Sequence, residues 1–86
     1  MKIVRTDLFK GDYKKLLERV KKQTEKALRL LLSNLYYPSL RAKKIKNKEN
    51  IWEARMTKGY RFSFQIIGDT YILRRAGKHN EILKKP

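Results

Sequence analysis

The spacing of apolar residues changes from a helical to a strand period at Pro38. Before this proline, between residues 13 and 35, apolar residues recur at intervals of three and four, which is one face of a helix. After it, residues 60–67 alternate between apolar and polar, which is typical of a strand with one buried face. Proline lacks a backbone donor and restricts the residue before it, so it separates the two parts. Helices followed by strands predict an α+β fold.

The part before Pro38 predicts one strand and two helices. Lys2–Arg5 is the strand, and Asp12 is a suitable N-cap for the first helix. The second helical pattern covers about Gln23–Asn34, and the short connection between them predicts an antiparallel hairpin. The apolar faces of the two helices are formed by Tyr13, Leu16, Leu17 and Val20, and by Ala27, Leu28, Leu31 and Leu35.

The part after Pro38 predicts four strands joined by turns, and then a short basic tail, Glu81–Pro86. The predicted strands are Ala42–Lys46, Ile51–Thr57, Tyr60–Ile67 and Thr70–Ala76. With 86 residues there is enough chain for one domain, residues 1–86. We therefore expect an N-terminal strand and a helical hairpin packed on one face of a small antiparallel sheet, with the other face open.

The charge of the chain indicates a polyanionic partner. There are 23 Lys and Arg residues against 8 Asp and Glu, a net charge of +15. Solubility needs a net charge of only about 2 to 8 in a small domain. Nucleic acid, an acidic protein or an anionic membrane surface would fit. No apolar run is long enough to span a membrane and no signal peptide is recognisable, so we expect a cytoplasmic protein without a membrane role.

Several kinds of chemistry are excluded by the residues that the chain lacks. It has one histidine and no cysteine, so we expect no metal site and no disulfide. It has no glycine-rich phosphate-binding motif, so we expect no nucleotide cofactor. Glu53 is the only acid within the predicted strands after Pro38, which argues against a hydrolase with paired carboxylates.

The basic residues of the strands are the candidate site. Because neighbouring strands lie side by side, their cationic groups can converge on the open face and bind phosphate. The ring of Tyr60 could stack on an unpaired base, and Trp52 could stack there or pack in the core. His79, after the last strand, could act as a general acid or base near neutral pH. The candidate cations are Arg41, Lys43, Lys44, Lys46, Arg55, Arg61 and Arg75.

Five segments together resemble one family. They are LRAKKI (40–45), IWEAR (51–55), GYRFSF (59–64), YIL (71–73) and GKHNE (77–81). In their order and spacing, and with helices before them, the chain resembles the RelE/ParE superfamily of toxins from type II toxin–antitoxin systems. The pattern is most similar to that of the YoeB-like and RelE-like mRNA interferases.

The resemblance implies a ribosome-dependent endoribonuclease that inhibits translation and is neutralised by an acidic antitoxin protein. Arg61 matches the arginine that contacts the scissile phosphate, and His79 matches the acid/base residue after the last strand. Lys43, Lys44 and Arg55 are the nearest equivalents of further phosphate-binding residues. The implied reaction is metal-free attack of a 2′-OH on its own 3′ phosphate, with mRNA on the ribosome as the substrate.

The chain departs from the family pattern in two places. No carboxylate stands near Arg41, where YoeB-like members carry the base, so Lys43, Lys44 and Glu53 all stay open for that role. The tail around Leu83 lacks the aromatic residue that stacks on the substrate base in many members. Two alternatives to the nuclease therefore stay open: a ParE-like inhibitor of DNA gyrase, and an RNA- or ribosome-binding module without catalysis.

Overall fold

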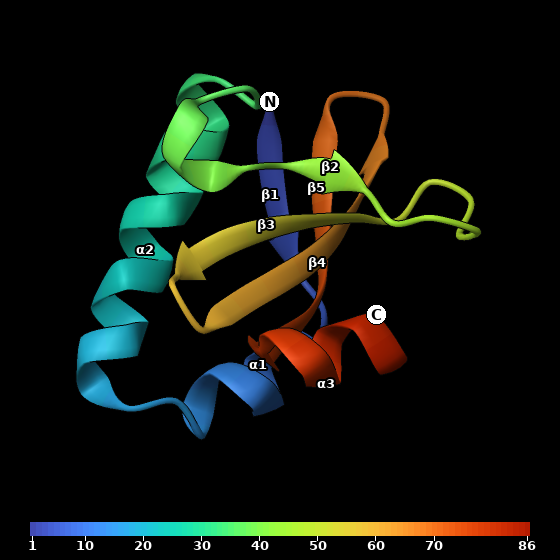
Figure 1. Cartoon of the computed structure of the whole chain (residues 1–86). Coiled ribbons are helices and arrows are strands. Elements are labelled where there is room, and N and C mark those ends of the chain that lie inside the picture. Colours follow the sequence, from blue (N-terminus) through green and yellow to red (C-terminus); the bar gives the residue numbers. More distant parts are fainter.

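A five-stranded mixed sheet forms the centre of the molecule. The computed structural model describes all residues, 1–86, and the strand order is β1-β5-β4-β3-β2 (Figure 1). The strands are β1 (Lys2–Arg5), β2 (Lys43–Lys44), β3 (Trp52–Thr57), β4 (Tyr60–Ile67) and β5 (Thr70–Lys78). The helices are α1 (Asp7–Lys14), α2 (Glu18–Ser33), the 3-10 turn η1 (Pro38–Leu40) and α3 (His79–Lys84). The predicted α+β class is confirmed.

The sheet is antiparallel from β2 to β5, as predicted, but β1 adds to it in parallel. Lys2 lies opposite Thr70 and Arg5 lies opposite Leu73. The prediction packed Lys2–Arg5 with the helices on one face of an antiparallel sheet, whereas it forms a parallel edge strand of that sheet. The direction of β1 relative to β5 depends on the path of the long intervening chain, and the local pattern of Lys2–Arg5 carries no information about it. β2 is also shorter than the predicted Ala42–Lys46.

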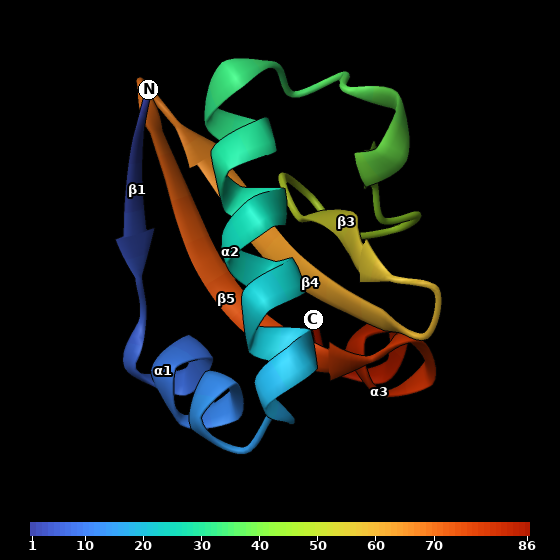
Figure 2. The same cartoon turned by 90° about the vertical axis from the view of Figure 1, so that its left-hand side faces the viewer.

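The helix boundaries differ from the prediction. α1 begins six residues before the predicted first helix, because the Thr6 hydroxyl caps it by accepting a hydrogen bond from the Phe9 N–H at 3.2 Å. Asp12 lies inside α1 and caps nothing. The helical run breaks at residues 15–17, so Leu17, predicted on a buried face, is exposed. Figure 2 shows α1 at an angle beside one end of α2, so the two do not form the predicted antiparallel hairpin.

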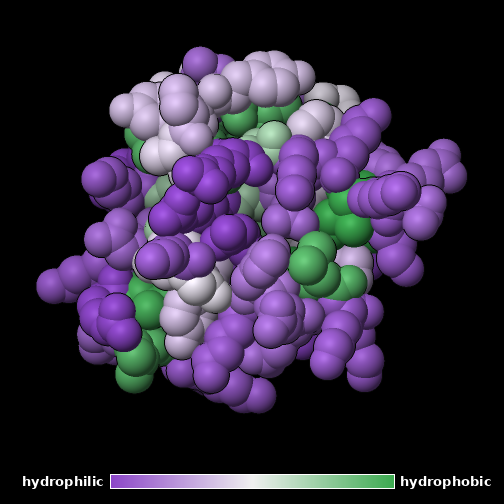
Figure 3. All heavy atoms as spheres, viewed as in Figure 1, coloured by the Kyte–Doolittle hydropathy of each residue, from purple (hydrophilic) through white to green (hydrophobic).

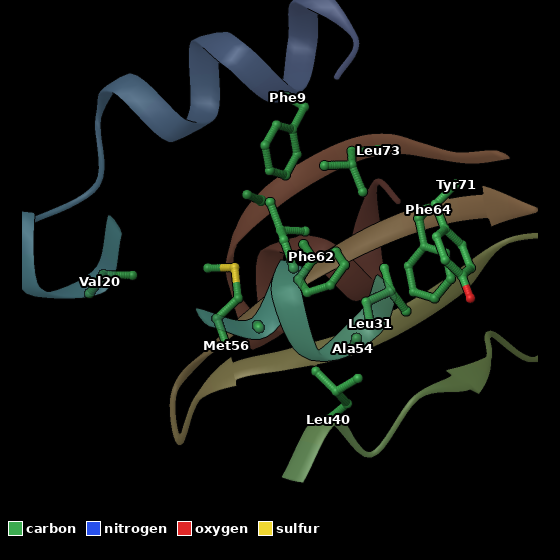
Figure 4. Packing of buried hydrophobic residues seen from close by; sticks show 13 residues of the cluster. Phe9, Val20, Leu31, Leu40, Ala54, Met56, Phe62, Phe64, Tyr71 and Leu73 are labelled. Carbon is green, nitrogen blue, oxygen red and sulfur yellow. The ribbon is translucent and has the colours of Figure 1, made fainter. Parts of the chain in front are cut away.

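The core lies between the helices α1 and α2 and one face of the sheet. Phe62, Phe64 and Leu73 from the sheet are fully buried against Phe9 of α1 and Leu31 of α2 (Figure 4). This confirms the predicted core face of β4. The Trp52 ring stacks on Phe64, with 6.1 Å between ring centroids, so Trp52 packs on the core side of β3.

The opposite face of the sheet was expected to be open, but the C-terminal segment covers one end of it. Residues 79–84, which overlap the predicted tail Glu81–Pro86, form α3, and Ile82 is buried over Gly77. The carbonyl of Pro86 accepts hydrogen bonds from the Ser63 hydroxyl at 3.2 Å and from Arg74 Nε at 3.0 Å. Figure 1 accordingly shows α2 and α3 on opposite sides of the sheet. No helix has the length and apolar character that crossing a membrane requires.

Candidate functional site

Strand register places basic residues on the face turned away from α2. Arg55 of β3 lies directly opposite Arg61 of β4, and Glu53 lies between Lys43 of β2 and Ser63 of β4. Directly opposed residues of an antiparallel pair point to the same side. Figure 3 shows that the surface around β2, β3 and α3 is mostly hydrophilic, with separated hydrophobic spots. We refer to Arg41, Arg55 and Arg61 as the arginine cluster.

Arg61 is held rigidly by the turn between β3 and β4. Its Nη1 donates hydrogen bonds to the carbonyls of Thr57 at 3.0 Å, Tyr60 at 3.1 Å and Lys58 at 3.3 Å. Its Nε lies 3.8 Å from Glu53 Oε1. Nη2 makes no hydrogen bond within the chain, and no buried side-chain nitrogen lacks a partner, so Nη2 reaches the solvent.

The surroundings of Arg61 disfavour the positive charge of its own guanidinium group. Burial lowers the pKa of Arg61 below its usual value, and the neighbouring Arg55 and Arg41 lower it further, while Glu53 opposes them. An arginine stays charged in proteins even so. The result is a partly desolvated cation with one unpaired amino group, which an anion such as phosphate would stabilise.

His79 lies at the same end of the sheet as Arg61. It is the first residue of α3, and its backbone N–H donates to the carbonyl of Gly59 at 3.0 Å. This bond ties the start of α3 to the turn that holds Arg61. A hollow of about 420 Å³ is lined there by Lys58, Gly59, Tyr60, Lys78, His79 and Asn80.

The structure brings Arg41, Arg55 and Arg61 together, with Lys43 on the same face and His79 at the end where β4 begins. Tyr60 alternates with Arg61 along β4 and packs against the core, although it also lines the hollow beside His79. Lys44 instead lies opposite Trp52 on the core side, with its Nζ 5.7 Å from the indole centroid. Lys46 is exposed in the loop between β2 and β3, outside the arginine cluster. The roles proposed for these residues from the sequence stay predictions.

Arg75 is engaged in an ion pair within the fold. Its Nε donates to Asp12 Oδ2 at 2.7 Å and its Nη2 donates to Oδ1 at 3.2 Å. The hydrogen bond to Asp12 raises the pKa of Arg75 above its usual value, against the effect of burial. Arg75 thereby connects β5 to α1, and binding of a phosphate by Arg75 would have to compete with this carboxylate.

A second hollow adjoins the arginine cluster and includes residues that the sequence did not single out. It measures about 460 Å³ and lies between α2, η1 and β3. Gln23 and Lys26 of α2 line it together with Arg41 and Arg55. Arg41 has a φ of 48°, in the left-handed region, immediately after η1. No local pattern connects a helix at residue 26 to a strand at residue 55, because the two meet only in the folded chain.

No family model and no curated protein matches the sequence. A chain of the RelB–RelE antitoxin–toxin complex from Methanococcus jannaschii matches the structure with a TM-score of 0.78 at 26% identity, over 96% of this chain and 99% of that one. The chain has the fold of the RelE/ParE toxin superfamily.

Other RelE/ParE structures agree in fold at lower identity. The YoeB/ParE toxin from Agrobacterium tumefaciens has a TM-score of 0.77 at 19% identity, over 92% of this chain and 99% of that one. YafQ from E. coli has a TM-score of 0.78 at 16% identity, over 93% and 94%. The resemblance inferred from the sequence motifs is therefore confirmed. No three His, Cys, Asp or Glu side chains gather where they could hold a metal ion.

Proposed function

We propose that this chain is the toxin of a type II toxin–antitoxin system and that it inhibits translation by cutting mRNA on the ribosome. The observation that carries the proposal is the fixed guanidinium of Arg61. Three carbonyls and Glu53 hold it, while its Nη2 stays available to a ligand. His79 starts the helix that is bonded to the same turn. A phosphate-binding cation and a titratable group at one end of a sheet fit RNA cleavage better than binding alone.

The proposed reaction is transesterification within the RNA strand. The 2′-oxygen attacks the adjacent phosphorus, the bond to the 5′-oxygen breaks, and the products are a 2′,3′-cyclic phosphate and a 5′-OH. Negative charge grows on the phosphoryl oxygens, where Arg61, Arg55 and Lys43 stabilise it. His79 donates a proton to the departing 5′-oxygen.

The proposed inhibitor is an acidic antitoxin protein. The net charge of +15 favours a partner of opposite charge. Solved structures that this chain resembles include the RelB–RelE complex of Methanococcus jannaschii and the DinJ–YafQ complex of E. coli, each a toxin with its antitoxin.

The test is translation of a defined mRNA in a cell-free system, with new 5′ ends mapped by primer extension. The wild-type protein is expected to cut at fixed codon positions only when ribosomes engage the message. Arg61→Ala and His79→Ala are each expected to lower the cleavage rate at least about 100-fold, the usual contribution of a catalytic acid or charge-stabilising group. Arg29→Ala, which removes an exposed arginine from α2, is the matched control and is expected to cut normally.

Two other results would contradict the nuclease. An intact message with normal translation, together with inhibition of DNA gyrase supercoiling, would indicate a ParE-like inhibitor. An intact message with stalled translation would indicate binding to RNA or the ribosome without chemistry.

A further inference from the structure

Glu53 is the one buried acid of the chain, and it lies among cations. Glu53 is 4% exposed to solvent, whereas the other seven Asp and Glu residues are all more exposed. Lys43 and Ser63 stand opposite it on the two neighbouring strands, and Arg61 Nε lies 3.8 Å away. Burying a carboxylate is costly unless it is paired and hydrogen-bonded. Such a position in the middle of a small sheet therefore needs a physical reason.

The carboxylate of Glu53 accepts no hydrogen bond from the chain. The contact with Arg61 is longer than a hydrogen bond, and the Nη1 donors of Arg61 serve the turn carbonyls instead. Asp12, by contrast, accepts three hydrogen bonds, two from Arg75 and one from the Ala76 N–H. No fully buried side-chain oxygen lacks a partner, so the Glu53 oxygens keep a small contact with solvent.

Glu53 and His79 lie on either side of the phosphate-binding group. Glu53 is next to the Nε side of Arg61, and His79 follows the β5 segment whose Gly77 lies opposite Arg61. Lys44 lies on the other face, and Lys43 supplies donors and no acceptor while it is protonated. Asp12 and Glu81 line a hollow with Arg75, and neither forms an ion pair with Arg61. Glu53 is therefore the acceptor that this face offers to a ligand bound at Arg61.

We propose that Glu53 is the general base of the cleavage reaction, an assignment that rests on the function proposed above. The proton of the 2′-OH passes to a Glu53 carboxylate oxygen as the O2′–P bond forms and the P–O5′ bond breaks. His79 gives its proton to O5′, and Glu53 returns the proton it received to water. The carboxylate needs no hydrogen bond from the protein because the substrate hydroxyl supplies one.

The first experiment separates binding from chemistry. Wild type, Glu53→Gln, Glu53→Asp and Glu49→Gln are compared on ribosomes programmed with a short mRNA, under single-turnover conditions. Affinity is measured in parallel with the same message carrying a 2′-deoxy nucleotide at the cut position. Glu49→Gln is the matched control, because it removes the same charge from the exposed loop before β3.

Glu53→Gln is expected to cut about 100-fold to 10,000-fold more slowly than wild type, the usual range for loss of a general base. Its affinity for the 2′-deoxy message is expected to be equal or higher, since a negative charge leaves the phosphate site. Glu53→Asp keeps a carboxylate and is expected to retain intermediate activity. Cleavage by Glu53→Gln at the wild-type rate would overturn the proposal. So would equal losses of rate and affinity, which would make Glu53 a positioning residue for Arg61.

A second substrate tells whether a substitution affects removal of the proton from the 2′-OH or donation of a proton to the 5′-oxygen. When sulfur replaces the 5′-oxygen at the cut site, the leaving thiolate departs without a proton. His79→Ala is expected to recover on this substrate, whereas Glu53→Gln is expected to stay slow, because its 2′-OH still has to lose a proton. Recovery of Glu53→Gln would overturn the assignment as base. If the wild-type protein cuts neither message, the proposed function itself is wrong. If the wild-type protein and Glu53→Gln both cut at the same rate, only the assignment of Glu53 as the base is wrong.

Discussion

Asp12 shows how a single side chain can connect distant parts of this chain. It lies in α1 and accepts hydrogen bonds from Arg75 at 2.7 and 3.2 Å and from the Ala76 N–H at 3.0 Å, all in β5. Burial, the largest single effect, raises the pKa of Asp12. The hydrogen bonds from Arg75 and Ala76, together with the positive charges of Arg75 and Lys15, outweigh it, so the pKa lies below its usual value of 3.8. The sequence suggested an N-cap because aspartate is common there; the contact with residue 75 exists only in the fold.

Asp12→Asn is expected to lower the free energy of unfolding at pH 7 by about 1–2 kcal/mol, through loss of the charge-assisted hydrogen bonds. A lowered folded-state pKa means that Asp12 stabilises the fold above pH 3.8 and that this contribution disappears as the pH falls through the folded pKa. Urea unfolding at several pH values between 7 and 3 would show it. The difference in free energy of unfolding between wild type and Asp12→Asn should become smaller in acid. Glu49→Gln, in an exposed loop, should have the same free energy of unfolding as wild type at each pH. A gap that stays constant with pH would contradict this account.

At the scale of elements, α3 decides where the candidate acid of the reaction stands. His79 is its first residue, and Ile82, one turn later, is 3% exposed and contacts the sheet over Gly77. α3 has only six residues, too few to be stable alone. Its position therefore depends on burial of Ile82 and on the bond from His79 to Gly59.

Ile82→Ala is expected to lower the free energy of unfolding by about 2–4 kcal/mol, as is usual when a buried isoleucine is truncated. The α3 amides should exchange hydrogen faster, and RNA cleavage should fall more than RNA binding, because His79 loses its fixed position. Leu83→Ala is the control: Leu83 is 44% exposed, and its loss should change stability by no more than about 0.5 kcal/mol. Equal effects of the two substitutions, measured by hydrogen exchange and urea unfolding, would show that Ile82 does not anchor α3.

At the scale of the whole molecule, only a few of the basic residues form ion pairs within the fold. Four acids form ion pairs: Glu25 with Arg5, Glu18 with Lys21, Glu53 with Arg61 and Asp12 with Arg75. Most of the 23 Lys and Arg residues have no such partner. For the proposed RNA substrate, we expect long-range attraction from the whole surface and direct phosphate contacts at the arginine cluster.

The double variant Arg41→Gln/Arg55→Gln is expected to weaken the dependence of RNA affinity on salt. Each phosphate contact on a single strand adds about 0.7 to the slope of log affinity against log salt, so two lost contacts should lower it by about 1.4. Fluorescence anisotropy with a 2′-deoxy-substituted oligonucleotide at several salt concentrations measures the slope. Arg19→Gln/Arg29→Gln removes two exposed arginines of α2 and should leave it nearly unchanged. Similar changes in both variants would mean that RNA contacts are spread over the surface.

The elements with a clear local signal were predicted well. Alternation in residues 60–67 gave β4 its bounds and its core face, and Lys2–Arg5 was placed correctly. The break between the helices was misplaced because the apolar spacing of residues 13–20 continues through residues 15–17. α3 was missed because six residues are too short to show a helical period, and it is held in place by contacts with β4 and β5.

The sequence by itself determined the class of the fold, the family resemblance and the set of basic residues, because periodicity, motif order and net charge are properties of the chain. Only the tertiary structure decided which cations are available. It places Arg61 beside Glu53, turns Lys44 to the core side and engages Arg75 with Asp12. It also decided the surroundings of Glu53, whose neighbours Lys43 and Ser63 come from two other strands. Such relations depend on register and strand order, which join residues far apart in the chain, and no local pattern encodes them.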